Sequence, residues 1–146
     1  KVYQFKGFPQ VNLYNVKLNI PGDTLVQEDK FILRASIING LNTADYKKNQ
    51  KTSKVQYFDY DKLKGGINIR KREGGDIIKP VNSNGTKKLK KYFIDEKIPI
   101  DIRNHIPLVA KGKEIVWIIG YVISDKFKIT KDTQKILKLE FIKLET

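Results

Sequence analysis

The chain has 146 residues, of which 40% are hydrophobic, enough for the core of one compact domain or two small ones. Lys and Arg number 29 against 16 Asp and Glu, and the net charge of +13 favours a polyanionic partner, with nucleic acid ahead of an anionic membrane. The absence of cysteine excludes disulfides and thiolate metal sites and fits a reducing cytoplasm, and no apolar run approaches the roughly 20 residues that span a bilayer.

The first part of the chain predicts strands and one long loop. Residues 11–20 alternate imperfectly between apolar and polar side chains, and residues 31–37 alternate cleanly, as a half-buried strand does. Residues 41–54 are polar and predict a long mobile loop. We therefore expect residues 1–56 to form an N-terminal β-rich subdomain with this loop. Because the chain starts at Lys1 and contains no Met, we also expect a piece of a longer protein.

The next elements carry the first basic cluster. Val55 and Tyr57 resume a strand, a polar connection follows at residues 59–64, and Gly65-Gly66 permits a sharp turn. The strand after this turn ends in the triplet Arg70-Lys71-Arg72.

From Thr86 onward the apolar period changes to that of a helix. Leu89, Tyr92 and Phe93 fall on one face, four lysines fan around the other, and Thr86 is placed as an N-cap. Pro99 can open a second short helix that runs through residue 103, and Pro107 cannot continue it.

The last part of the chain predicts strands again. Residues 109–119 form a hairpin whose second arm is almost entirely apolar, as in a strand buried on both sides, and residues 136–144 form a closing strand. The fold class is α+β, mostly antiparallel β-sandwich-like sheets with two or three short helices. We take residues 57–146 as the second domain.

The sequence contains none of the catalytic motifs for which we searched, including phosphate-binding loops and metalloprotease helices. His105 is the only histidine and receives no role. Asp95 and Glu96 are neighbours on the predicted helix, so they point apart and cannot act together as acid and base. Asp76 is expected to pair with Arg70 or Arg72. The sequence therefore predicts no catalytic residue and no metal site.

Basic residues interleaved with aromatic ones remain as the functional signal. Lys and Arg are dense between residues 70 and 97, which suits a phosphate-binding surface, although a solvated lysine face is the usual meaning of such a pattern. Lys126, Lys128 and Lys131 form a second basic group beside Phe127. Aromatic side chains here could stack on bases, but the apolar neighbours of Trp117 favour a place in the core.

Several stretches resemble the C-terminal region of tRNA-isoleucine lysidine synthases. They are residues 85–99 (GTKKLKKYFIDEKIP), 103–108 (RNHIPL), 115–121 (IVWIIGY) and 124–130 (SDKFKIT), together with the basic entry at 69–76 (IRKREGGD) and Pro80. Their order and spacing agree with the family over roughly residues 57–146, and residues 16–38 are similar more weakly. The family often has Arg where this chain has Val122.

The resemblance implies a non-catalytic tRNA-binding part of an ATP-dependent ligase that converts the wobble cytidine of a minor isoleucine tRNA to lysidine. ATP and Mg²⁺ belong to an N-terminal catalytic domain with an S-G-G-x-D-S loop, which is absent here, so no cofactor is expected in this chain. The implied fold is an unusual β-sandwich with helices, shared with a phenylalanyl-tRNA synthetase domain. The expected partners are tRNA(Ile), through its acceptor stem, and the catalytic domain.

The basic side chains that match the family or flank its motifs are the candidate tRNA contacts. They are Arg70, Arg72, Lys87, Lys88, Lys90, Lys91, Arg103, Lys126 and Lys128. Three alternatives remain. The first is a structural docking module without RNA contact. The second is a stand-alone enzyme, for which this sequence lacks a catalytic constellation, and the third is a membrane-surface protein, for which it lacks a free apolar helix face. The sequence leaves open whether two copies form a homodimer.

Overall fold

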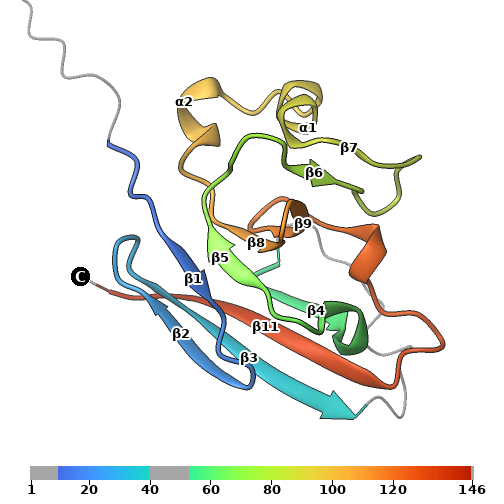
Figure 1. Ribbon diagram of the computed structural model, residues 1–146. Helices are drawn as coiled ribbons and strands as arrows, with labels where there is room; N and C mark the ends of the chain where they lie inside the picture. The colour runs from blue at the N-terminus through green and yellow to red at the C-terminus, as the bar shows by residue number, and fades with distance from the viewer. Residues whose placement is uncertain (1–9, 40–52, 146) are drawn as a thin grey trace, which may run out of the picture.

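Two β-sheets and a helical layer make up the computed structural model, which describes residues 10–39 and 53–145 (Figure 1). One sheet has four strands and the other seven. The α+β class, with mostly antiparallel strands and short helices, is confirmed. Within the described ranges, no helix has both the length and the apolar character needed to cross a membrane.

The four-stranded sheet has the order β2-β3-β11-β4, with every pair antiparallel. Its strands are β2 (Gly22–Val26), β3 (Phe31–Asn39), β11 (Lys135–Lys143) and β4 (Val55–Asp59). The predicted alternating strands are confirmed in β3 and β11, which pair along nine positions, from Phe31 opposite Lys143 to Asn39 opposite Lys135. One face of this sheet faces the other sheet, and it carries the side chains that alternation predicts to be buried.

The seven-stranded sheet has the order β1-β5-β8-β9-β6-β7, and β10 pairs with β9. Its strands are β1 (Asn15–Lys17), β5 (Asn68–Arg70), β8 (Leu108–Lys111), β9 (Glu114–Ile118), β6 (Ile77–Ile78), β7 (Lys87–Lys88) and β10 (Val122–Ile123). As predicted, β9 is central and its residues from Ile115 to Ile118 are all buried. The strand expected over residues 11–20 is shorter than predicted, since β1 covers only Asn15–Lys17. Before it, Asn12 and Tyr14 bind Asp29, in the turn between β2 and β3, through their side chains.

Two hydrophobic clusters lie on opposite faces of the seven-stranded sheet. The first fills the space between the sheets, where Trp117 of β9 packs near Phe58 of β4 with ring centroids 6.2 Å apart. The second lies between the seven-stranded sheet and the helices α1 (Leu89–Asp95) and α2 (Ile100–Arg103), and Phe93 is fully buried in it. The seven-stranded sheet is therefore the middle layer.

The start of the first helix differs from the expectation. Thr86 is not an N-cap, because the helix begins at Leu89 and its N-cap residue is Lys88, which makes no side-chain cap bond. Lys87 and Lys88 instead pair with Ile78 and Ile77 as strand β7. Edge pairing with β6 satisfies these backbone groups, so the chain cannot enter the helix until Leu89. The second helix and the return to strand after Pro107 are confirmed.

The expected boundary at residue 56 stays a prediction. Strands from either side of it share both sheets, since β1 pairs with β5 and β3 pairs with β11. Residues 40–52, which hold most of the predicted mobile loop, lie outside the described residues. The described residues also contain two short 3-10 helices, η2 (Tyr60–Leu63) and η3 (Asp125–Phe127).

Candidate nucleic-acid interface

Arg70, the first residue of the basic triplet, is buried with only 3% of its surface exposed. Its two terminal nitrogens donate to the carboxylate of Asp76 at 3.0 and 2.8 Å, and they also donate to the carbonyls of Lys71 and Gly112, both at 2.9 Å. The predicted pairing of Asp76 with an arginine is confirmed. Arg70 therefore stabilises the loop and has no exposed donor for a phosphate, contrary to its selection as a candidate contact.

Lys71 also points into the protein, since both faces of the seven-stranded sheet are covered. It is 3% exposed, its Nζ lies 2.8 Å from Asp29, and it sits 5.0 Å above the ring of Tyr14. This buried ion pair ties the turn between β2 and β3 to the other sheet. Arg72 is therefore the one residue of the triplet whose side chain is accessible to a ligand.

Arg72 is half-buried and is held from two sides. Its Nε donates to Oδ1 of Asn104 at 2.7 Å, and its guanidinium lies 5.5 Å from the ring centroid of Phe93. Burial and the positive charge of Arg103 lower the pKa of Arg72, against a smaller opposite effect of Asp76. The protein thus holds this cation in a fixed position close to a second cation.

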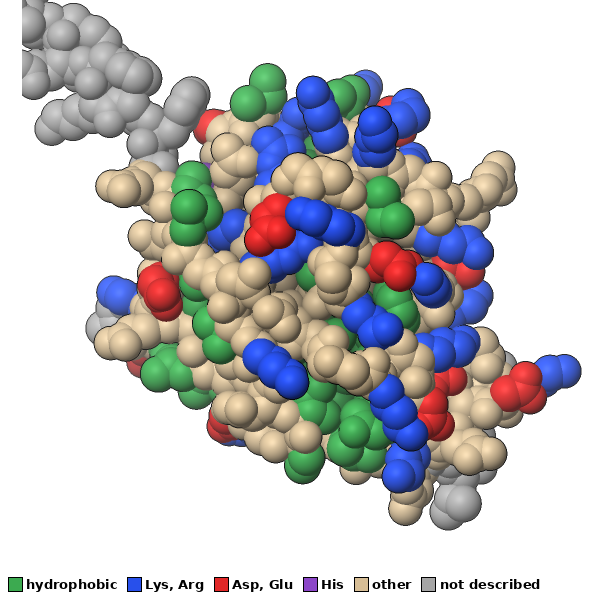
Figure 2. Space-filling view, viewed as in Figure 1, with side chains coloured by type: hydrophobic (Ala, Val, Ile, Leu, Met, Phe, Trp, Pro, Cys, Tyr) green, Lys and Arg blue, Asp and Glu red, His purple; other side chains and the backbone are tan. Residues whose placement is uncertain are grey.

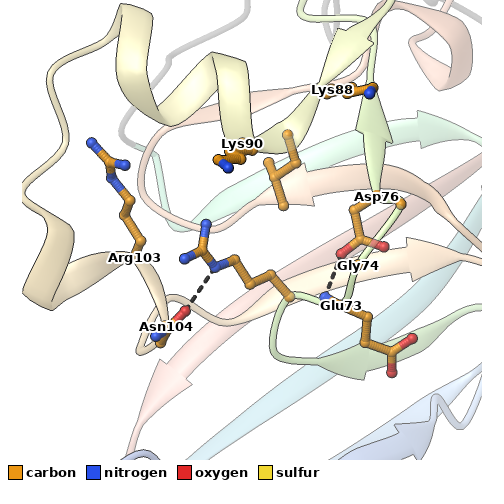
Figure 3. Close-up of a pocket in the computed structure, with 10 residues that line it drawn as sticks. Glu73, Gly74, Asp76, Lys88, Lys90, Arg103 and Asn104 are labelled. Atoms are coloured by element: carbon orange, nitrogen blue, oxygen red, sulfur yellow. Dashed lines mark hydrogen bonds between the residues drawn. The ribbon is translucent and has the colours of Figure 1, made fainter.

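A pocket of about 530 Å³ opens in front of Arg72. Its wall comes from the loop after β5, from the junction of β7 and α1, and from the end of α2, as Figure 3 shows. Four cationic side chains line it: Arg72, Lys88, Lys90 and Arg103. In Figure 3, Arg103 and Lys88 lie toward opposite ends of the pocket, and Lys90 lies between them. We call this the basic pocket.

The acids of the basic pocket are already occupied. Asp76 binds Arg70, and Glu73 pairs with Lys113 at 3.2 Å, pointing away from Lys90 and Arg103 (Figure 3). Arg103 donates through Nε to the carbonyl of Ile98 at 2.8 Å. Among the described residues, none of the four pocket cations forms an ion pair with a carboxylate. Their charge is therefore available to an anionic ligand.

Comparison with known proteins identifies the family of the chain. The family model for the TilS substrate C-terminal domain matches residues 67–141, which include every residue of the basic pocket. The chain belongs to the TilS substrate C-terminal domain family. This domain is also similar in fold to a crystal structure of a TilS C-terminal domain, with a TM-score of 0.71 and 20% identity over 92% of this chain and 100% of that one.

Similar full-length proteins are tRNA(Ile)-lysidine synthases. One from Caldanaerobacter subterraneus subsp. tengcongensis is 47% identical over 130 residues, which is 86% of this chain and 26% of that protein. One from Clostridium perfringens is 40% identical over 136 residues, which is 90% of this chain and 28% of that protein. The TilS C-terminal domain described here thus spans about a quarter of the length of these relatives.

The remaining lysines at α1 differ from the pocket lysines in having an acidic partner. Lys87 and Lys91 lie 3.1 and 3.3 Å from the two carboxylate oxygens of Asp95. The hydrogen bond from Lys87 is the main reason that the pKa of Asp95 is lowered, and Lys91 adds to it. Asp95 is therefore ionised at neutral pH and partly neutralises this pair. Figure 2 shows that Lys and Arg side chains gather over the helical layer, with few acidic side chains between them.

Two of the three lysines in the second basic group, Lys126 and Lys128, are paired with acids. Lys126 binds Glu114, and Lys128 lies 2.7 Å from Asp125. Phe127 between them is only 2% exposed, so it packs in the core and cannot stack on a base as considered from the sequence. Trp117 is fully buried, as predicted. This group is a weaker candidate than the basic pocket.

Two pocket features were missed by the sequence analysis. Asn104 orients Arg72 from a position 32 residues away, and Phe93 serves both as a core residue and as the surface on which Arg72 rests. Asn104 lies inside the RNHIPL motif, so the motif was the only available signal. Nothing in the sequence indicated that Arg72 stacks on Phe93, because Phe93 falls on the apolar face of the helix and was expected only in the core.

Proposed function

We propose that this chain is the non-catalytic tRNA-binding part of a tRNA(Ile)-lysidine synthase. It holds tRNA(Ile), with the acceptor stem as the expected contact, while the catalytic domain of the same enzyme converts the wobble cytidine to lysidine. The observation that carries the proposal is the basic pocket, whose four cations are free of carboxylates among the described residues. The names of the similar proteins supply the identity of the RNA.

The chemistry of the site suits an RNA backbone. Arg and Lys donate charge-assisted hydrogen bonds to phosphate oxygens, and a fixed guanidinium loses little freedom when it does so. The major groove of A-form RNA is deep and narrow, so side chains on a duplex read its shape and phosphates and cannot reach the base edges there. Selection of one tRNA then depends on where this domain holds the acceptor stem relative to the catalytic domain.

We propose that ATP, Mg²⁺ and the ligase chemistry belong to the catalytic domain, and that the protein works in the cytoplasm, where tRNA is modified. In residues 10–39 and 53–145, no three His, Cys, Asp or Glu side chains gather into a group that could hold a metal ion. We propose that the role of this chain is to bind and orient the RNA.

The test is tRNA(Ile) binding by this chain over a salt series. The double variant Lys88→Gln with Lys90→Gln removes two pocket cations, and Lys135→Gln with Lys143→Gln removes two exposed lysines at the ends of β11 as a charge-matched control. Each lost phosphate contact lowers the log-log slope of affinity against salt by about 0.7 to 0.9. We expect a weaker, less salt-dependent complex for the pocket variant only.

The control decides between specific contact and general charge. If both double variants weaken binding equally, net charge alone attracts the RNA and the basic pocket has no special role. If neither variant nor the parent chain binds tRNA, the chain is a structural module that docks on the catalytic domain without touching RNA. Circular dichroism of each variant verifies that it is folded.

A further inference from the structure

We infer that the basic pocket receives the terminal phosphate of the tRNA, the phosphomonoester at its 5′ end, and not an internal phosphodiester. This inference rests on the proposed function and names the part of the RNA that the pocket recognises. Three properties of the pocket support it: its shape, the number of its cations and the way in which they are held.

The pocket is concave and large enough for a nucleotide-sized group. Its volume of about 530 Å³ lies within the range of about 300–1,000 Å³ that is typical of small-molecule sites. A phosphate inside a duplex is flanked by a nucleotide on each side, so it can enter such a hollow only if the backbone bends. A terminal phosphate has a nucleotide on one side only and can enter it without distortion of the helix.

The charge of the pocket exceeds what one diester needs. A phosphodiester carries a single negative charge, whereas a phosphomonoester carries about −1.5 to −2 at pH 7 and offers three acceptor oxygens. Arg72, Lys90 and Arg103 come from three different segments and line the same pocket. Three cationic donors lining one pocket match the three acceptor oxygens of a monoester, and Lys88, at the other end of the pocket from Arg103 (Figure 3), could bind the phosphate of the next nucleotide.

The two arginines are held together against their mutual repulsion. Asn104 and Phe93 fix Arg72, and the carbonyl of Ile98 fixes Arg103. No carboxylate among the described residues forms an ion pair with either guanidinium. The lowered pKa of Arg72, caused by burial and by Arg103, is consistent with this repulsion. A dianionic group between the two guanidinium groups removes the repulsion, so the geometry is pre-organised for an anion of high charge density.

The acceptor-stem contact of the proposed function agrees with this geometry. In any tRNA the 5′ end is the end of the acceptor stem, so a domain that binds the stem can reach it. Phosphate contacts fix the register of a protein on a duplex, and a contact to a chain end fixes that register relative to the end of the stem.

The experiment compares tRNA(Ile) carrying a 5′-phosphate with the same tRNA after phosphatase treatment, which leaves a 5′-hydroxyl. We expect this chain to bind the 5′-hydroxyl form about tenfold more weakly, as befits the loss of a charged hydrogen-bonded group. In Arg103→Gln and in Lys90→Gln the ratio between the two RNAs should fall toward one, while Lys135→Gln with Lys143→Gln should keep the full ratio. Lys90 is exposed, so its variant tests the pocket even if loss of an arginine disturbs folding.

The possible outcomes separate this inference from the proposed function. Equal affinity for the two RNAs, with tight salt-dependent binding of both, overturns the terminal-phosphate assignment and keeps tRNA binding. If this chain binds neither RNA, both the terminal-phosphate assignment and the proposed tRNA binding are wrong. Competition with AMP and inorganic phosphate distinguishes the source of the phosphomonoester: strong binding of AMP together with equal affinity for the two tRNAs assigns the pocket to a free nucleotide and overturns the RNA-end assignment.

Discussion

Asp76 holds both terminal nitrogens of Arg70, at 3.0 and 2.8 Å, and both side chains are almost completely buried. The same carboxylate accepts the backbone N–H of Glu73 at 2.7 Å. This network closes the loop that lines the basic pocket, so it fixes the backbone next to Arg72.

We predict that Arg70→Ala and Asp76→Asn are strongly destabilising. Each removes one partner of a buried ion pair and leaves the other uncompensated, which costs about 3–5 kcal/mol of unfolding free energy. Urea denaturation measures the loss. The exposed pair of Arg34 and Asp23, at 2.9 Å, is the matched control, and Arg34→Ala should have a much smaller effect because solvent screens that pair. Similar losses at the two pairs would contradict the buried role.

We predict that Asp95→Asn strengthens tRNA binding. The change removes a negative charge from the basic surface and frees Lys87 and Lys91 from their shared partner. The affinity at low salt should rise several-fold, and the slope against salt should become steeper, because each freed lysine can release a counterion from the RNA. Binding titrations at two or more salt concentrations measure it. A weaker complex would mean that Asp95 positions these lysines for the RNA and does not compete with it.

We predict that Asn104→Ala weakens tRNA binding with little change in stability. Asn104 is exposed and accepts one hydrogen bond from Arg72, so its loss leaves the fold intact and lets the guanidinium rotate. A hydrogen bond of this kind contributes about 0.5–1.5 kcal/mol, which corresponds to an affinity about two- to tenfold lower. The affinity and the melting temperature are measured on the same preparation. An unchanged affinity would show that Phe93 alone orients Arg72.

We predict that Trp117, the only tryptophan, reports folding and not RNA binding. It is fully buried between the sheets, so its emission should be blue-shifted in the folded protein and unchanged by added tRNA. Trp117→Ala should cost about 3–5 kcal/mol of stability. Its indole N–H has no hydrogen-bond partner in the described part of the chain, so Trp117→Phe should cost much less. Quenching by tRNA would contradict the core position.

The sequence predicted the elements whose pattern is local. The alternation at residues 31–37 and 136–144 predicted β3 and β11, since one face of each is buried over its whole length. Pro99 and Pro107 delimited α2 for steric reasons that do not depend on the rest of the protein. The pairing of Arg70 with Asp76, six residues apart, was within the reach of the same kind of argument.

The missed features depend on residues that are distant in sequence. Lys87 and Lys88 form a strand because Ile77 and Ile78 lie beside them, and an amphipathic pattern of residues 86–98 cannot reveal that neighbour. Arg70 and Arg72 carry the same charge two residues apart, yet one is buried and the other lines the pocket. Only the positions of Asp76, Gly112 and Asn104 in the fold distinguish them.

The place of β11 in the four-stranded sheet has a consequence for protein synthesis. It lies between β3 and β4, which both precede it in the chain and do not pair with each other. While the ribosome is still making residues 135–143, β3 and β4 each present an unpaired edge. This sheet can close only after β11 has emerged, so the inner side chains of β3 are protected late, and a nascent chain that stalls before β11 is a target for chaperones and proteases.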